Sequence, residues 1–163
     1  MELKTLNEIE IISAPHSKIS EVDFENLTFG NVFTDHMLVC DYVDGAWQKP
    51  VIEPYAPFMI DPSAKVFHYG QAIFEGMKAY KDKQDDVWLF RPDENFYRFN
   101  KSATRMAMPE VPEDVFLGGL HRLLEIEKEW VKKGSGTSLY IRPFMIATGH
   151  GVIAAPSQEY RFM

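Results

Sequence analysis

The chain has 163 residues, and its 24 Asp and Glu outnumber its 17 Lys and Arg, which gives a formal net charge of -7 at pH 7. The 45% hydrophobic and 25% charged residues are typical of a single globular domain and exclude intrinsic disorder, collagen-like repeats and coiled coils. Proteins bind nucleic-acid phosphates through an excess of Lys and Arg, which this chain lacks, so we expect no nucleic-acid partner.

The sequence also carries no signal for a disulfide, a metal site or a membrane span. Cys40 is the single cysteine, and no cluster of Cys and His has the spacing of a zinc site. The first residues, MELKTLNEIEIIS, lack the apolar segment of a secretory signal, and no run approaches the roughly 20 apolar residues of a membrane span. We therefore expect a soluble, cytoplasmic protein without a metal ion or a membrane partner.

Strand and turn signals dominate the first part of the chain. Roughly the first 25 residues are polar and mixed, and we expect them to be irregular or to form a short edge strand. Residues 32–43 are rich in β-branched and aromatic side chains and predict a strand, Asp44-Gly45 predicts a tight hairpin turn, and residues 47–55 predict the return strand. Prolines between residues 54 and 62 predict a loop.

A short helix, a second hairpin and a longer helix are predicted next. Residues 69–76, YGQAIFEG, predict a short helix that ends at its second glycine. Residues 77–82 and 87–92 flank a polar turn and predict a hairpin. Helical periodicity predicts a helix over residues 93–106, with Asp93 as the capping residue at its start.

The last part of the chain predicts one more helix and further strands. A long helix is expected from Pro112 to Gly134, because proline is favoured at the first helical position and one apolar stripe runs along the segment. The stripe consists of Phe116, Leu120, Leu123, Leu124 and Trp130. Residues 138–148, SLYIRPFMIAT, predict one apolar strand, residues 149–158 a loop, and the last residues the start of another strand. Strands, helices and strands in successive blocks predict an α+β fold.

Arginine side chains are the candidate ligands for an anion. Arg98 and Arg105 lie seven residues apart on one predicted helix and share a face, and a guanidinium binds phosphate with two hydrogen bonds. The alternative is an ordinary solvated helix face. Arg142 interrupts an apolar strand, where an unpaired charge is costly, and the strand period places Tyr140 on the same face. This pair belongs either to an anion pocket or to an edge strand whose arginine faces water or a structural carboxylate.

No further motif identifies a reaction. The segments Tyr69-Gly70 and Phe74-Glu75-Gly76 permit a close approach of the backbone to a ligand, but a turn and a helix end explain them more simply. The sequence contains no nucleophile elbow, P-loop or dinucleotide-binding glycine motif. From the residues alone we infer an α+β domain with a candidate anion site.

Taken in order, however, several segments resemble the branched-chain aminotransferases, pyridoxal-phosphate enzymes of the D-amino-acid-aminotransferase fold (fold type IV). The segments are FHYGQAIFEGMKAY, then LFRP, N-x-x-R and S-A-x-R-M, and later GTSLYIRPFMIAT. LTFGNVFTDHMLVCDY matches the subgroup with a longer N-terminus. The resemblance extends from about Leu27 to Met163 and implies the small N-terminal domain of that fold, with an antiparallel sheet and helices packed on one side.

The resemblance also implies roles for individual residues. Arg98, in the N-x-x-R context, matches the arginine that binds the cofactor phosphate, which favours it over Arg105. Tyr140 and Arg142 match a pair that faces the substrate, where the arginine receives the distal carboxylate of glutamate. The other matches line the pocket for the branched side chain or, in the interdomain loop, contact the partner subunit's substrate. They are Phe29, Tyr69 and Phe74 for the pocket, with Tyr69 reaching the partner's site, and Val152 and Ile153 for the loop.

The chain departs from the family in its length and in the cofactor residues that it lacks. Family members are longer, and no residue here matches the lysine that binds pyridoxal 5'-phosphate covalently, the glutamate near the pyridine nitrogen or the threonines that complete the phosphate site. Lys78 lies on a predicted hairpin strand where the family has no catalytic role. The resemblance therefore implies that residues 1–163 are the N-terminal domain of a homodimeric enzyme and contain no catalytic residue. We expect this chain alone to be inactive, to bind the cofactor weakly or not at all, and to associate into dimers or larger assemblies.

Two alternatives remain open at this stage. One is another enzyme of the same fold, such as a D-amino-acid transaminase or an aminodeoxychorismate lyase. The other is a non-catalytic binding module that uses half of the fold. The leading interpretation is transfer of the amino group between Leu, Ile or Val and 2-oxoglutarate.

Overall fold

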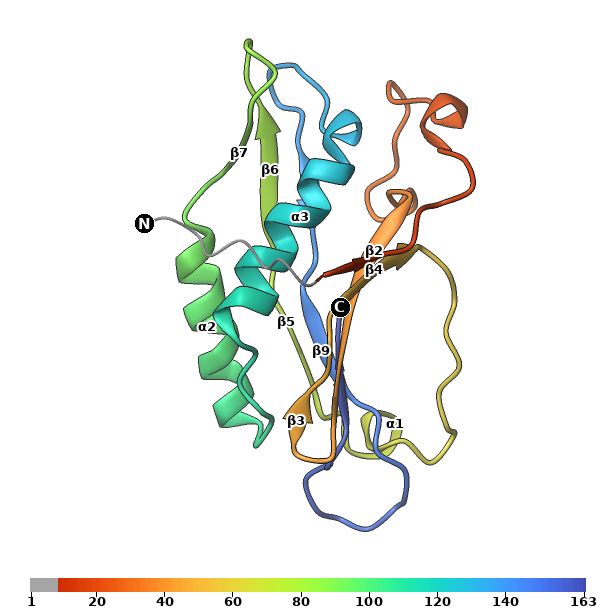
Figure 1. The fold of residues 1–163 in the computed structure, drawn as a ribbon, viewed down its shortest axis with the longest axis vertical. Coiled ribbons are helices and arrows are strands. Elements are labelled where there is room, and N and C mark those ends of the chain that lie inside the picture. Colours follow the sequence, from red (N-terminus) through yellow and green to blue (C-terminus); the bar gives the residue numbers. More distant parts are fainter. Residues whose placement is uncertain (1–8) are drawn as a thin grey trace.

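The computed structural model describes residues 9–163, whose strands form two sheets with helices beside them (Figure 1). The strands are β1 (Glu10–Ile11), β2 (His36–Val43), β3 (Ala46–Trp47), β4 (Val51–Pro54), β5 (Ala72–Phe74), β6 (Met77–Lys81), β7 (Val87–Leu89), β8 (Leu139–Ile141), β9 (Phe144–Ala147) and β10 (Tyr160–Phe162). The helices are the 3-10 turn η1 (Ile19–Glu21), α1 (Lys65–Tyr69), α2 (Pro92–Arg105), the π-helical turn η2 (Asp114–Gly118), α3 (Gly119–Ile126) and the 3-10 turn η3 (Lys128–Trp130). The expected α+β class is confirmed.

The larger sheet runs in the order β1-β4-β2-β10-β9-β5, with β3 paired to β2, and the smaller sheet in the order β7-β6-β8. All pairings are antiparallel except that of β1 with β4. β1 is thus the short edge strand expected near the N-terminus, and residues 1–8 of that prediction lie outside the described residues. Within the described range, no helix combines the length and the apolarity needed to cross a bilayer.

Three local predictions are confirmed. Asp44 and Gly45 both have positive φ, 54° and 78°, as a tight turn of the primed type requires, and Val43 pairs with Ala46 across it. β6 and β7 form the second hairpin. The helix expected over residues 93–106 is α2, although its N-cap is Arg91 and not Asp93, with Pro92 at the first helical position.

Three other predictions are wrong in part or in full. The strand over 32–43 begins only at His36, and the return strand over 47–55 is divided between β3 and β4. The helix over 69–76 does not form: α1 ends at Tyr69 and β5 begins at Ala72. Pairing with β9 overrides the weak helical signal of so short a segment, because helices shorter than ~12 residues are marginal without tertiary support.

The long helix expected from Pro112 to Gly134 is interrupted at Glu127 and ends by Trp130. The side chain of Glu127 is buried, its Oε1 lies 2.5 Å from Nδ1 of His36, and its Oε2 accepts from the backbone N–H of Asp35 at 3.4 Å. Asp35 in turn accepts from the indole of Trp130 at 3.0 Å. The helix therefore ends where its polar side chains bind the start of β2, a long-range contact that helical periodicity does not encode.

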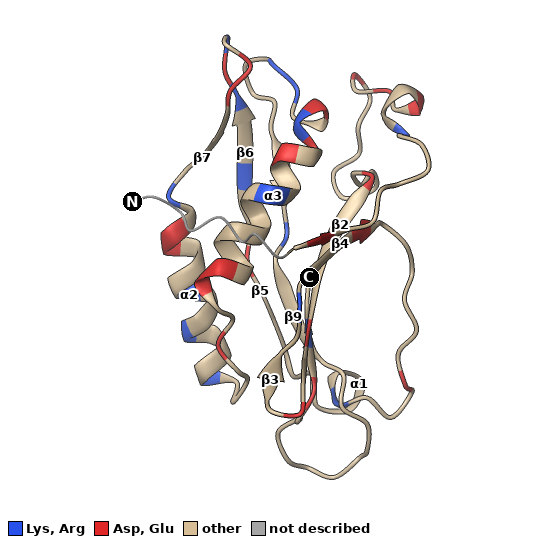
Figure 2. Ribbon diagram, viewed as in Figure 1, with Lys and Arg blue, Asp and Glu red and all other residues tan. Residues whose placement is uncertain are grey.

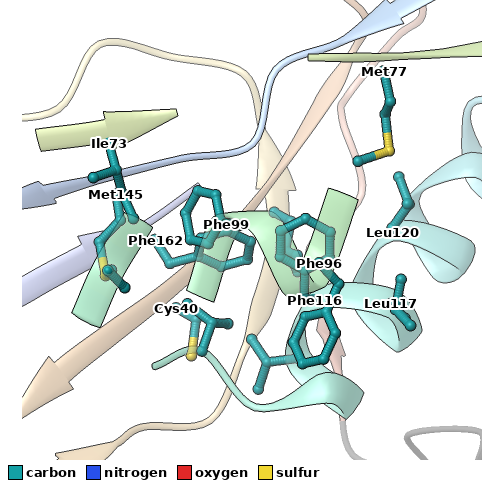
Figure 3. Packing of buried hydrophobic residues seen from close by; sticks show 14 of the residues in the cluster. Cys40, Ile73, Met77, Phe96, Phe99, Phe116, Leu117, Leu120, Met145 and Phe162 are labelled. Carbon is teal, nitrogen blue, oxygen red and sulfur yellow. The ribbon is translucent and has the colours of Figure 1, made fainter. Parts of the chain in front are cut away.

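The core lies between the helices and one face of the larger sheet. The rings of Phe99 from α2 and Phe116 from η2 pack on Phe162 from β10, with centroids 5.5 and 5.6 Å apart (Figure 3). Of the apolar stripe expected along residues 116–130, Phe116, Leu120 and Leu124 belong to this core, Leu123 packs against it, and Trp130 is buried as well. Helices on one side of an antiparallel sheet thus account for the burial pattern.

Candidate functional site

Two neighbouring connections carry the chain from one sheet to the other, and the candidate site residues gather there. β5 in the larger sheet leads through Glu75-Gly76 into β6 of the smaller sheet. β8 in the smaller sheet leads through Arg142-Pro143 into β9 of the larger sheet. The backbone N–H of Glu75 donates to the carbonyl of Pro143 at 2.8 Å, which holds the two crossings together. We call this region the sheet joint.

The single strand expected over residues 138–148 is therefore wrong, because the segment forms two strands in different sheets. Pro143 has no backbone N–H and cannot continue a ladder, so pairing ends at Ile141 and resumes at Phe144. The break leaves Arg142 outside both strands and exposed, so of the two interpretations left open by the sequence its side chain fits the one that faces water, although not from within a strand.

Arg98 projects from α2 to the sheet joint and forms a two-point ion pair with Glu75. Its Nε lies 2.5 Å from Oε1 and its Nη2 lies 2.7 Å from Oε2 of that carboxylate. The Glu75 side chain is 6% exposed, whereas that of Arg98 is 65% exposed. The hydrogen bond from Arg98 lowers the pKa of Glu75, and the carboxylate in turn raises the pKa of Arg98.

Further donors complete the environment of the Glu75 carboxylate. The side-chain amide of Asn95 donates to Oε2 at 3.0 Å, and the backbone N–H of Gly76 donates to the same atom at 3.2 Å. The sequence predicts no role for Glu75. Its one signal was that it is the single charged residue in the run AIFEGM, the kind of anomaly that also marked Arg142.

Arg142, Tyr140 and Phe74 form a second cluster at the sheet joint. Nε and Nη2 of Arg142 donate to the Tyr140 hydroxyl at 3.1 and 2.8 Å, and the guanidinium carbon lies 4.3 Å from the centroid of the Phe74 ring. The predicted pairing of Tyr140 with Arg142 is confirmed. The position over an aromatic ring and the two donations to one oxygen restrict the movement of the guanidinium.

Phe29 and Gly76 complete the surroundings of Tyr140. The Phe29 ring meets the Tyr140 ring edge-on, with centroids 5.0 Å apart. A Cβ on Gly76 would lie 2.5 Å from the Tyr140 hydroxyl oxygen, so the tyrosine occupies space that only glycine leaves open. Phe29 and Phe74 are 74% and 64% exposed, so the cluster presents an aromatic surface beside the arginine.

The remaining candidates, Tyr69, Val152 and Ile153, form a separate group at the other end of the larger sheet. Tyr69 ends α1, and its hydroxyl donates to the Val152 carbonyl in the loop between β9 and β10, at the bottom of Figure 1. Val152 and Ile153 are 62% and 76% exposed. No hydrogen bond or aromatic contact of the described residues joins this group to the sheet joint.

Arg105 lies apart from the sheet joint. Arg105 is the last residue of α2, about two helical turns from Arg98, and is exposed.

Residues 9–163 contain no group of three or more His, Cys, Asp or Glu that could hold a metal ion. Lys and Arg lie on many elements, together with acidic residues, over the part of the chain coloured in Figure 2. The sheet joint can therefore offer guanidinium donors and aromatic faces to an anionic, partly apolar molecule.

Comparisons with known sequences identify the relatives of the chain. It is 53% identical over 142 residues to branched-chain-amino-acid transaminase 1 of Bacillus subtilis, and this covers 86% of the chain and 40% of the relative. It is 46% identical over 147 residues to the branched-chain-amino-acid aminotransferase of Mycolicibacterium smegmatis, covering 89% of the chain and 40% of the relative. The chain thus spans about two fifths of the length of these curated relatives. No protein-family model matches it.

Solved structures support the fold. The branched-chain amino acid aminotransferase of Thermobaculum terrenum, in its PLP form, matches with a TM-score of 0.55 at 17% identity, over 78% of this chain and 39% of that chain. The enzyme of Thermoproteus uzoniensis with norvaline matches with a TM-score of 0.52 at 19% identity, over 78% and 40%. At this identity the likeness concerns the fold alone. The sequence relatives confirm the resemblance inferred from the motifs: over the stretch that it shares with them, the chain belongs to the branched-chain aminotransferases.

Proposed function

We propose that the protein to which this chain belongs transfers the amino group between L-leucine, L-isoleucine or L-valine and 2-oxoglutarate. In this proposal residues 1–163 are its N-terminal domain, and the covalent cofactor lysine lies outside them. The observation that carries the proposal is the sheet joint, where an aromatic surface, a tyrosine–arginine pair and a second, braced arginine lie together in a chain 53% identical to such a transaminase. The cytoplasm and a homodimer are parts of the same proposal.

The residues present fit the phosphate of pyridoxal 5'-phosphate. Arg98 uses its Nε and Nη2 for Glu75, and no acceptor among the described residues engages its Nη1. A guanidinium that is braced on one edge and 65% exposed is well suited to bind a phosphate through its remaining donors. When bound, the cofactor supplies the electron sink that stabilises negative charge at the amino-acid Cα.

The chemistry of the second cluster suits a pocket with two kinds of substrate. Phe29, Phe74 and the ring of Tyr140 offer apolar surface to a branched aliphatic side chain. Arg142 and the Tyr140 hydroxyl offer donors to the distal carboxylate of glutamate or 2-oxoglutarate. One site can thus accept both substrates because the arginine lies over an aromatic ring. Tyr69, Val152 and Ile153 are proposed to contact the substrate bound by the partner subunit.

The proposal is tested on the full-length protein with two arginine variants. Arg142→Leu should lower kcat/KM for glutamate at least about tenfold more than for leucine, because only glutamate brings a second carboxylate. Arg98→Ala should weaken retention of pyridoxal phosphate about tenfold or more, measured by equilibrium dialysis, because a charged hydrogen-bond donor is lost. Equal losses for both amino acids would make Arg142 structural, and unchanged cofactor retention would remove the role of Arg98.

Activity assays of the same full-length protein distinguish between the alternatives. Turnover of D-alanine without turnover of L-leucine would favour a D-amino-acid transaminase, and release of pyruvate from aminodeoxychorismate would favour the lyase. A full-length protein without any of these activities would favour the binding module. The 163-residue chain alone, given pyridoxal phosphate, should not transaminate and should sediment as a dimer or larger species.

A further inference from the structure

Lys65, the first residue of α1, is a buried lysine that binds no carboxylate among the described residues. The residue is 8% exposed, although lysine is rarely buried without a partner. Its ammonium donates instead to two backbone carbonyls of the loop between β9 and β10, to Ile153 at 2.8 Å and to Ala155 at 2.9 Å. A buried ammonium is costly unless it is hydrogen-bonded, and these two carbonyls provide its acceptors in place of a carboxylate.

The neighbours of Lys65 hold the same loop. The backbone N–H of Lys65 donates to the Gly149 carbonyl at 3.1 Å, and the Ser63 hydroxyl accepts from the Gly151 N–H at 3.0 Å. Tyr69 donates to the Val152 carbonyl, and its ring centroid lies 5.9 Å from the Lys65 ammonium. Residues 149–155 are thus shaped by side chains and backbone of residues 63–69, since a loop has no ladder to satisfy its carbonyls.

This arrangement determines which way the loop presents its side chains. The carbonyls of residues 152, 153 and 155 are bound by Tyr69 and Lys65, whereas the side chains of Val152 and Ile153 are 62% and 76% exposed. Of the side chains that hold the loop, only Lys65 contributes a full charge and two contacts. Loss of its ammonium would leave the Ala155 carbonyl without this donor and the Ile153 carbonyl with only the Ala155 N–H, next to a buried side chain.

We propose that Lys65 is a positioning residue that holds residues 149–155 so that Val152 and Ile153 face an apolar substrate side chain. This inference rests on the proposed function, because it assigns the exposed pair to the amino-acid site. Lys65 does not touch the substrate. It acts on affinity for apolar amino acids by fixing the loop before the substrate binds.

The experiment compares three variants of the full-length protein with the wild type. Lys65→Met keeps the length of the side chain and removes the ammonium, Lys65→Arg restores a cationic donor, and Lys49→Met is the matched control at an exposed lysine. Hydrogen exchange is measured at the amides of Gly151 and Ala155, which donate to Ser63 and Ile153. Steady-state kinetics are measured with leucine and with glutamate.

For Lys65→Met we expect exchange at these two amides about tenfold faster, with exchange in β9 and β10 unchanged. We expect KM for leucine to rise about fivefold or more with kcat within about twofold, and a smaller rise for glutamate. Lys65→Arg should recover most of both effects, and Lys49→Met should show neither. Should Lys65→Met fail to fold, Ser63→Ala releases the same loop at Gly151 and is measured in the same way.

Unchanged exchange in Lys65→Met would overturn the inference, because the ammonium would not hold the loop. Faster exchange with unchanged KM, or an equal fall of kcat with both amino acids, would overturn it as well, because the loop contact would be merely structural. A wild-type protein that transaminates neither amino acid would instead refute the proposed function. In that case hydrogen exchange still reports whether Lys65 holds the loop.

Discussion

Glu75 provides the most direct test of the sheet joint, because its carboxylate is buried while its partner Arg98 is exposed. Glu75→Gln keeps the shape of the side chain and removes its charge. It leaves a single carbonyl oxygen to accept from Arg98, Asn95 and the Gly76 N–H, where the carboxylate has two. A hydrogen bond to a charged group contributes about 1.5–3 kcal/mol. Solvent around the exposed guanidinium screens that interaction, so we expect the free energy of unfolding to fall by about 1 kcal/mol at neutral pH.

The pH dependence of this loss follows from the pKa of Glu75, which the hydrogen bond from Arg98 lowers below its ordinary value. A carboxyl whose pKa is lower in the folded state stabilises the fold above its unfolded pKa, and the contribution is lost as pH falls through the folded pKa. The difference between wild type and Glu75→Gln should therefore be full at about pH 7, shrink as the pH falls below the unfolded pKa, and vanish in stronger acid.

Urea unfolding at about pH 7 and at about pH 3 measures this difference from the transition midpoints. The control is Glu125→Gln, which removes an ion pair with Arg122 whose side chains are 62% and 48% exposed, and its effect should stay within about 0.5 kcal/mol. A loss of equal size at both pH values would show that Glu75→Gln acts through packing and not through its charge. An effect no larger than that of the control would mean that the ion pair with Arg98 does not stabilise the sheet joint.

Two further predictions concern a close contact and a buried thiol. Gly76→Ala places a Cβ 2.5 Å from the Tyr140 hydroxyl oxygen, so the tyrosine must move. We expect a crystal structure of the variant to show that the Arg142–Tyr140 contact is lost. An unmoved tyrosine ring would contradict the close packing. Burial and, to a lesser extent, the charges of Asp41 and Asp114 raise the pKa of the Cys40 thiol to about 12. The folded protein should therefore not react with iodoacetamide at about pH 8, whereas the urea-unfolded protein should react. Rapid alkylation of the folded protein would refute this.

Much of the local structure was predictable because its causes lie within a few residues. The turn at Asp44-Gly45 and the helix that begins at Pro92 depend on φ preferences and on the first helical turn. The apolar stripe from Phe116 to Trp130 identified the face of the helical segment that packs into the core. The resemblance to branched-chain aminotransferases was likewise visible in ordered motifs, because those motifs are contiguous in the chain.

The sequence by itself therefore determined the α+β class, the second hairpin, the helix that carries Arg98 and the family resemblance. Only the tertiary structure decided that residues 138–148 enter two sheets, that residues 72–74 are a strand, and that Glu75 pairs with an arginine 23 residues away. The physical reason is that strand pairing and buried ion pairs depend on partners remote in the chain, whereas turns and caps depend on neighbours. The site lies where two such long-range pairings meet, and no local pattern places Glu75, Arg98 and Arg142 at one joint.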